Sequence, residues 1–255
     1  MELIKRFWKN YKAVVYAAFI FMAILLSLYL IIPDKTSSLE DYGDLVLDSR
    51  GNIVRATLNN SQQWCFPPLE DFFISEKFKQ ATLNFEDRWF YAHPGVNPFS
   101  LVRAFFINLW YNRILSGGST ITMQLARLSD PKPRNLISKV IEILQAFKLE
   151  IKYSKDEILS KYLNHAPYGR NIQGYRAASL FYFGKEPYKL NWSEASVLAV
   201  LPNSPGLVSP GQNQGKLVKK RNRLLKTLLL RDLIDKDIYN LSILEDVPDK
   251  LYTLY

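Results

Sequence analysis

The chain has 255 residues and a formal net charge of +9, from 33 Lys and Arg against 24 Asp and Glu. This length accommodates a membrane segment and one domain of roughly 200 residues with a sizeable core. The single cysteine, Cys65, excludes an internal disulfide and a thiolate metal site, so we interpret it as a small buried residue. The positive charge favours anionic partners such as phosphates, anionic lipid or nucleic acid, without choosing between them.

Residues 13–32 are an unbroken run of uncharged, mostly apolar residues. As a helix they would rise about 1.5 Å each and match a hydrocarbon core roughly 30 Å thick, so they predict a transmembrane anchor. A cleaved signal peptide is the alternative, but no small-residue cleavage pattern closes the run. Four basic residues precede it: Lys5, Arg6, Lys9 and Lys12. The positive-inside tendency therefore places residues 1–12 in the cytoplasm and the rest outside, away from nucleic acid.

A polar linker, 33–44, leads to two short predicted strands within 45–55, joined around Gly51. Helical periodicity then runs from 74 to 85, where large apolar residues recur at helical spacing. If this helix continues through the stretch 86–95, Glu86, Phe90 and His93 fall at i, i+4 and i+7. A carboxylate, an aromatic ring and an imidazole would then share one face, which marks a candidate site.

The segment 97–115 is dense in large apolar residues, including Trp110 and Tyr111 at its end. It predicts a helix with apolar residues on nearly all sides. One interpretation is a core helix. The other is a helix that dips into the outer leaflet of the membrane, which would bring the site to the lipid.

The rest of the chain predicts a succession of helices. The hydroxyl-rich stretch from Ser116 turns helical before Arg127, and a loop with two prolines follows at 129–134. Amphipathic periodicity predicts a helix over 136–152, and capping boxes begin at Ser154 and Asn191. Further elements are a glycine-containing loop at 168–174, a helix that stops at Gly184, and a basic helix over 216–231. That basic run indicates either a solvated face or contact with anionic headgroups.

Two carboxylates and several cations in a membrane-anchored chain suggest chemistry on an anionic, lipid-borne substrate. A sugar attached to a lipid diphosphate already has a good leaving group, so the site needs one base and a cationic cradle. Glu86 is the candidate base. Arg127, Arg134 and Lys139 can bind the diphosphate. Glu142 can orient these cations or hold a divalent cation, Mg or Mn. The structural alternatives are a carboxylate that complements a helix dipole and cations that are only solvated.

At these residues the sequence resembles a known family, the family 51 peptidoglycan glycosyltransferases. Its members occur as the first domain of class A penicillin-binding proteins and as stand-alone enzymes. Five motifs of the family appear in order over roughly residues 45–230: Glu86-Asp87-x-x-Phe90-x-x-His93-x-Gly95; Gly118-Ser119-Thr120-Ile121-Thr122-x-Gln124-Leu125; Arg134 through Lys139 to Glu142; Glu157-Ile-Leu-x-x-Tyr-Leu-Asn164; and Gly174-x-x-x-Ala177-Ala178 through Phe183-Gly184-Lys185.

The resemblance implies a mainly α, lysozyme-like, two-lobed helical domain over 45–235, followed by a tail over 236–255. One N-terminal transmembrane helix would hold it on the outer face of the cytoplasmic membrane. The implied enzyme polymerises lipid II into β-1,4-linked glycan strands, with inversion and release of undecaprenyl diphosphate, in bacterial cell wall synthesis. Expected partners are lipid II, the growing lipid-linked glycan strand, the membrane and other cell wall synthases. The segment 99–111 sits where the family has its membrane-dipping, mobile lobe.

The resemblance also assigns roles. Glu86 matches the base that deprotonates the acceptor 4-hydroxyl, and Glu142 matches the second catalytic carboxylate, linked to the leaving group or its cation. Arg127, which stands where the family usually has Lys, would bind the donor diphosphate with Arg134 and Lys139. The other expected substrate-binding residues are Asp87, His93, Ser119, Thr120 and Gln124.

The sequence departs from the family at two positions. Met123 replaces the first of two glutamines, and Ser138 replaces the arginine that usually precedes Lys139. Local matches, such as Met-Gln-Leu-Ala-Arg-Leu, resemble the C-type subgroup of class A penicillin-binding proteins, whose members carry a transpeptidase domain next. Here the only Ser-x-x-Lys, at 129–132, lacks a partner Lys-Thr-Gly and is interpreted as coincidence. The chain is therefore expected to be either a transferase-only protein or a fragment of a bifunctional enzyme, and the sequence does not choose between the two.

Three hypotheses follow. The leading one is a membrane-anchored glycan polymerase that uses lipid II. The second is a non-catalytic lipid II-binding or scaffolding protein of the cell wall machinery, motivated by Ser138 and the missing second domain. The third is a lysozyme-like hydrolase that cuts glycan, which would require Glu86 to act as an acid.

Overall fold

Helices dominate the structure, a computed structural model that describes residues 35–51, 53–68, 74–111, 117–203, 206 and 209–253, with shorter stretches between 11 and 33. The helices are α2 (Glu76–Glu86), α3 (Pro98–Trp110), α4 (Ile121–Ser129), α5 (Leu136–Lys152), α6 (Lys155–His165), α7 (Tyr175–Phe183), α8 (Trp192–Val200), α9 (Gln214–Leu229) and α10 (Lys236–Leu244). The strands are β1 (Leu45–Leu47), β2 (Ile53–Ala56), β3 (Pro167–Gly169) and β4 (Ile172–Gln173). The predicted mainly α class is confirmed.

Helix starts follow the side chains that cap them. Ser154 and Glu157 form a reciprocal capping box at the start of α6, and Asn191 and Glu194 form one at α8, both as predicted. The side chain of Asn135 accepts a hydrogen bond from the backbone N–H of the third residue of α5. This helix covers the predicted range 136–152. Local capping therefore accounts for these boundaries.

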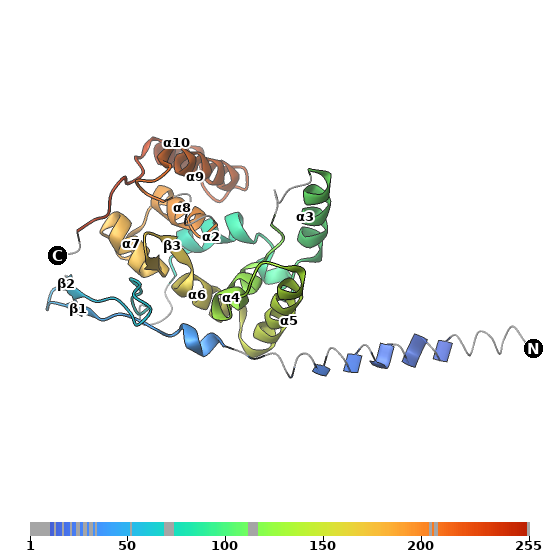
Figure 1. The fold of residues 1–255 in the computed structure, drawn as a ribbon. Coiled ribbons are helices and arrows are strands. Elements are labelled where there is room, and N and C mark those ends of the chain that lie inside the picture. Colours follow the sequence, from blue (N-terminus) through green and yellow to red (C-terminus); the bar gives the residue numbers. More distant parts are fainter. Residues whose placement is uncertain are drawn as a thin grey trace, which may run out of the picture.

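Two small hairpins accompany the helices. The predicted strands β1 and β2 pair antiparallel, and Figure 1 shows them beside α7, at the end of the molecule opposite α3. The stretch 168–174, expected as a loop, overlaps the second antiparallel pair, β3 and β4, which begins at Pro167. Arg170 and Asn171 both adopt positive φ in its turn, a conformation that asparagine tolerates better than most residues. The Asn171 carbonyl accepts from the backbone N–H of Trp64, which ties this hairpin to the segment after β2.

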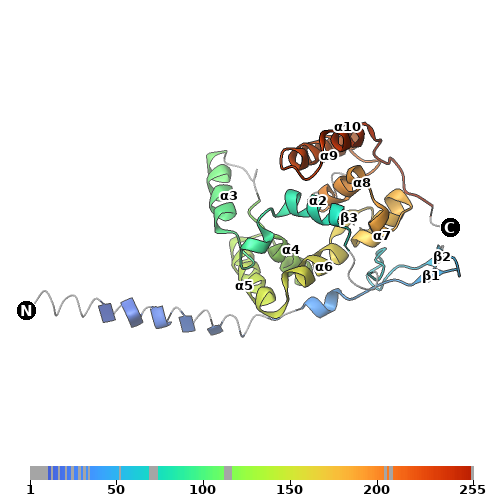
Figure 2. The same cartoon turned by 180° about the vertical axis from the view of Figure 1, so that it is seen from behind.

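Apolar side chains form two separate clusters in the described part of the chain. The larger cluster includes Phe78 of α2, Tyr162 of α6 and Leu198 of α8. The smaller one consists of Val96, Met123 of α4 and Ala146 of α5, with partly buried residues of α3 and α5 against it. Figures 1 and 2 show α3 and α5 on one side and α8 to α10 on the other, with α4 and α6 between them. Helix α4 contributes to both clusters and so joins the two sides.

Helix α3 does not have the burial of a core helix. Phe99 and Trp110 are 87% and 85% exposed, and Val102, Phe106 and Leu109 are more than half exposed. Figure 1 places this helix at one edge of the fold. The core-helix interpretation of 97–115 is therefore wrong for the described residues, which end at 111 before resuming at 117.

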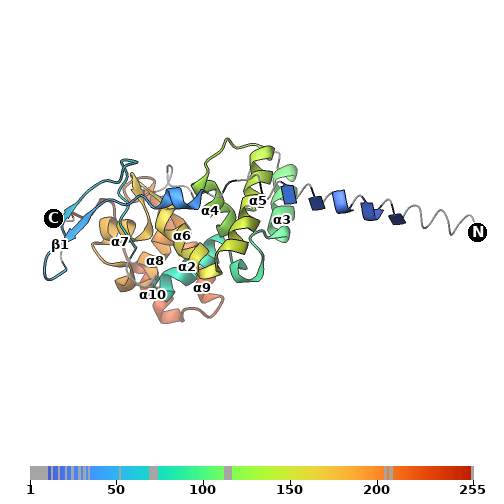
Figure 3. The ribbon, with the colours of Figure 1, turned by 90° about the horizontal axis from the view of Figure 1, so that it is seen from below.

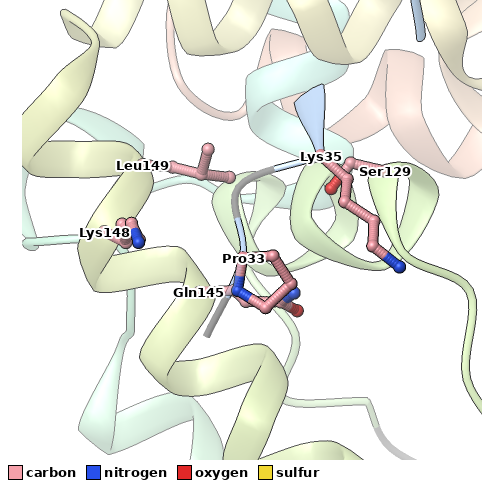
Figure 4. A pocket seen from close by; sticks show the side chains of 6 residues that line it. All are labelled: Pro33, Lys35, Ser129, Gln145, Lys148 and Leu149. Carbon is pink, nitrogen blue, oxygen red and sulfur yellow. The ribbon is translucent and has the colours of Figure 1, made fainter. Parts of the chain in front are cut away.

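The predicted anchor, 13–32, lies partly outside the described residues. Among the described residues, no helix has the length and apolar character needed to cross a membrane. Figure 3 shows the N-terminal segment leading away from the helical body. Where the chain joins the body, Pro33 and Lys35 lie beside α4 and α5, in a small pocket also lined by Ser129, Gln145, Lys148 and Leu149 (Figure 4). Lys35 Nζ pairs with Asp130 Oδ1 at 3.0 Å, which attaches the linker just after α4.

The basic run 216–231 is not a uniformly solvated face. Arg221 of α9 is 1% exposed. Its guanidinium donates to Ser193 Oγ at 2.9 Å and to the carbonyls of Ile243 and Glu245 at 3.1 and 2.6 Å. These bonds join α9 to α8 and to the last turn of α10. Residues beyond 235, expected as a tail, therefore include a helix that packs on α9.

The variant Arg221→Met is expected to lower the free energy of unfolding by about 3 kcal/mol, because it leaves one buried and two partly buried acceptors without this donor. The control is Arg223→Met, on an exposed face of the same helix. This variant should change the free energy of unfolding by less than about 0.5 kcal/mol. Chemical unfolding of the solubilised protein, followed by circular dichroism, measures both. Equal effects would mean that the buried hydrogen bonds of Arg221 do not stabilise α10.

Candidate active site

Glu86 is the last residue of α2, and the helix does not continue into the motif. Residues 90–92 form a short 3₁₀ turn, and His93 follows in an extended conformation. The expected shared face of Glu86, Phe90 and His93 is therefore wrong. Asp87, which follows the helix, has non-helical backbone with φ of −156° and ψ of 82°, and its carboxylate bonds to the backbone of α4.

Asp87 and His93 form a buried pair. His93 Nε2 lies 3.0 Å from both carboxylate oxygens of Asp87, and Asp87 Oδ2 also accepts from the backbone N–H of Ile121 at 3.1 Å. Asp87 thereby ties the end of α2 to the first residue of α4. Asp87 and His93 Nε2 thus help to position the two helices, whereas His93 Nδ1 is buried without a hydrogen-bond partner among the described residues. Substrate binding by these two side chains stays a prediction.

The two carboxylate oxygens of Glu86 differ in their hydrogen bonding. Oε2 accepts a hydrogen bond from Gln124 Nε2 of α4 at 2.8 Å, whereas Oε1 is buried without a hydrogen-bond partner among the described residues. Burial raises the pKa of Glu86; the Gln124 hydrogen bond, Lys220 and Arg127 oppose this rise, and Asp87 adds to it. A buried carboxylate with one available oxygen and a raised pKa has the properties of a general base.

Residues of the second motif, 118–125, form the start of α4. Thr120 caps the helix by accepting from the backbone N–H of Met123 at 3.2 Å, and its hydroxyl donates to the carbonyl of Gly95. Gly95 has φ of +87°, and a Cβ there would lie 3.0 Å from the Ala146 carbonyl of α5. Only glycine suits this position, because the backbone there has a left-handed conformation and also approaches α5 closely. Thr120, predicted to bind substrate, uses its hydroxyl within the fold.

Ser119, Lys139 and Glu142 form a polar group. Lys139 Nζ donates to Ser119 Oγ at 2.7 Å and pairs with Glu142 Oε1 at 3.1 Å, as the three-residue spacing of the two charges predicted. Glu142 is 8% exposed. Burial lowers the pKa of Lys139, and Glu142 opposes this effect. The carboxylate therefore helps to keep a partly buried ammonium group charged.

Arg127 lies on α4, the helix that also carries Gln124. Its charge acts on Glu86 and on Lys139, so the arginine lies within electrostatic reach of both. Arg134, by contrast, is exposed in the loop before α5 and makes no hydrogen bond or ion pair with any described residue. Of the three predicted diphosphate-binding cations, the structure thus brings two to the site.

Two further residues, Lys220 and Met123, lie in elements that form the site. Lys220 of α9 is close enough to Glu86 for its charge to act on the carboxylate, although the basic run gave no sign of this role. Its ammonium also donates to Asn203 Oδ1 at 3.0 Å. Met123, which departs from the family, is fully buried in the smaller apolar cluster and does not take the place of Gln124 at the carboxylate. The departure is therefore a core substitution.

A buried carboxylate at the end of one helix, with cations on two others acting on it, suits proton transfer beside an anionic leaving group. The family description "Transglycosylase" matches residues 50–229, so the chain belongs to the transglycosylase family. This result confirms the family predicted from the five motifs and, with it, the class of enzyme, a peptidoglycan glycosyltransferase.

Two relatives illustrate the similarity. Penicillin-binding protein 1C of Escherichia coli (strain K12) is 43% identical over 175 residues, which cover 68% of this chain and 22% of that protein. Penicillin-binding protein 1A of Aquifex aeolicus (strain VF5) is 38% identical over 167 residues, or 65% of this chain and 23% of that protein. The higher identity to the 1C protein agrees with the predicted C-type resemblance. The chain spans less than a quarter of the length of either relative.

A solved structure with similarity to this chain is the 2.6 Å crystal structure of penicillin-binding protein 1A from Haemophilus influenzae. The TM-score is 0.46 and the sequence identity 18%, over 81% of this chain and 21% of that one.

Proposed function

We propose that this chain polymerises lipid II into β-1,4-linked glycan strands, with inversion at the donor carbon and release of undecaprenyl diphosphate. The observation that carries this proposal is the placement of Glu86. Its buried carboxylate has one available oxygen, and Arg127 acts on both this carboxylate and the Lys139 group. Family membership supports the assignment of these residues to glycosyl transfer.

In the proposed reaction, Glu86 Oε1 takes the proton of the acceptor 4-hydroxyl as the hydroxyl oxygen attacks the anomeric carbon of the donor. The bond from that carbon to the diphosphate oxygen breaks with its electron pair, and the leaving diphosphate gains negative charge. Lys139 and Arg127 stabilise this charge, and Arg134, exposed in its loop, reaches the diphosphate from outside. Ser119 orients the Lys139 ammonium group, and Gln124 orients Glu86.

Glu142 is proposed to act through Lys139. Its Oε1 already pairs with this lysine, and no group of three or more His, Cys, Asp or Glu among the described residues is arranged to hold a metal. The described residues therefore do not fit a protein-held metal site. A divalent cation, Mg or Mn, would take its ligands mainly from the diphosphate, and the steps above do not require it.

The proposal places the enzyme at the outer face of the cytoplasmic membrane. The exposed apolar side chains of α3, such as Phe99 and Trp110, suit contact with the acyl region of a leaflet, where a lipid-borne substrate enters. The run 13–32 is proposed as a single-pass anchor with residues 1–12 in the cytoplasm, ahead of a lysozyme-like catalytic domain over 45–235. Other cell wall synthases remain proposed partners.

Incubation of the solubilised protein with labelled lipid II tests the function. The expected result is a glycan polymer that a muramidase digests, together with released undecaprenyl diphosphate. Retention of lipid II without polymer would contradict catalysis and support a binding protein. Release of fragments from finished cell wall, with no use of lipid II, would support a hydrolase instead.

A further inference from the structure

A hydrogen-bonded chain of three side chains ends at Glu86. Tyr162 of α6 donates its hydroxyl to Gln124 Oε1 at 3.2 Å, and Gln124 Nε2 donates to Glu86 Oε2 at 2.8 Å. Tyr162 is 1% exposed. The three residues come from α6, α4 and α2, and 38 residues separate each bonded pair along the chain.

The direction of this chain follows from the chemistry of its ends. An ionised carboxylate only accepts hydrogen bonds, so the Gln124 amide must turn its NH₂ group toward Glu86. The amide oxygen then faces Tyr162, which has to donate. Burial keeps the pKa of Tyr162 well above its ordinary value, so the hydroxyl stays protonated and remains a donor. If the amide flipped, two oxygens would face each other at Glu86 unless the carboxyl group were protonated.

We propose that Tyr162 is a positioning residue that acts through Gln124 to keep Glu86 in its ionised, proton-accepting form. The inference deepens the proposed function and rests on it, because the ionised form matters for catalysis only if Glu86 is the base. A phenylalanine at position 162 would lack this hydroxyl and would leave the Gln124 amide free to turn. Glu86 would then lose a hydrogen bond that stabilises its charged form, and its pKa would rise.

Other titratable groups also affect the pKa of Glu86, and their effects do not depend on the Tyr162 hydroxyl. Among the described residues, the charged ones are Lys220 of α9, Arg127 of α4 and the adjacent Asp87. Tyr168 is a further titratable group near it, and burial keeps its pKa well above the ordinary value, so it stays neutral. Helix α8 packs along α2 but adds no charged group to this set. A change confined to the Tyr162 hydroxyl therefore isolates the contribution of Gln124.

The test compares Tyr162→Phe with Tyr182→Phe in the whole solubilised chain of 255 residues. Tyr182 is also buried, and its hydroxyl donates one hydrogen bond of 2.9 Å to the Tyr168 carbonyl, without contact to Gln124 or Glu86. Infrared difference spectra against Glu86→Gln report the protonated carboxyl band of Glu86 as a function of pH. This readout requires no substrate. The pH dependence of lipid II polymerisation is measured in parallel.

Tyr162→Phe should raise the pKa of Glu86 by about one unit, a tenfold change in its ionisation constant, while Tyr182→Phe leaves it unchanged. Because the base must be deprotonated, the acid limb of the rate profile should move to higher pH by the same amount. An unchanged infrared titration in Tyr162→Phe, or an equal shift in both variants, would overturn the inference. Absence of polymerisation by wild type, with the infrared shift present, would instead contradict only the proposed function.

Discussion

The Glu86→Gln variant is expected to polymerise lipid II at least about 100-fold more slowly than wild type, because glutamine cannot take a proton at the position of Oε1. The substitution keeps the shape of the side chain and an oxygen that can accept from Gln124. It also removes a buried charge, so the midpoint of thermal unfolding should stay the same or rise. Initial rates with labelled lipid II and a thermal scan measure the two effects.

The matched control is Glu76→Gln on the same helix. Glu76 Oε1 also accepts from a glutamine, Gln80 Nε2, at 2.6 Å, but this pair is exposed. The control should retain wild-type activity. A polymerisation rate within about threefold of wild type in Glu86→Gln would exclude Glu86 as the general base, on the usual contribution of such a group.

Loss of the Lys139 ammonium group should also cause a large fall in the rate of lipid II polymerisation. Lys139→Met keeps an unbranched apolar stem but removes the cation that donates to Ser119 Oγ and pairs with Glu142. If this cation stabilises charge that develops on the leaving diphosphate, the maximal rate should fall about 100-fold to 1,000-fold. Rates at saturating and limiting lipid II separate this effect from weaker substrate binding.

Removal of Lys139 also leaves the Glu142 carboxylate unpaired in a buried position, which could lower activity through misfolding. The double variant Lys139→Met/Glu142→Gln removes this charge and should recover stability without recovering activity. Lys161→Met, which removes the ammonium of an ion pair with Glu40 at 3.3 Å, is the control elsewhere in the fold. Recovered activity in the double variant would show that Lys139 serves only to neutralise Glu142.

Much of the secondary structure could be predicted because it depends on neighbours within a few residues. The capping boxes at Ser154 and Asn191 and the amphipathic period of α5 are local patterns, and the structure follows them. The face that a continued helix would have given Glu86 and His93 does not form. The helix ends at Glu86, and the next residue, Asp87, bonds to His93 and to the backbone of α4, contacts that helical periodicity does not encode.

The sequence by itself determined the family, the mainly helical class, and the identity of Glu86, Lys139 and Glu142 as candidate site residues, since motif spacing and helical period are properties of the linear chain. Only the tertiary structure decided which polar groups meet. It placed Gln124 and Lys220 at Glu86 and buried Arg221 within a basic run. The physical reason is that hydrogen bonds between residues far apart in the chain depend on how helices pack, which no local pattern encodes.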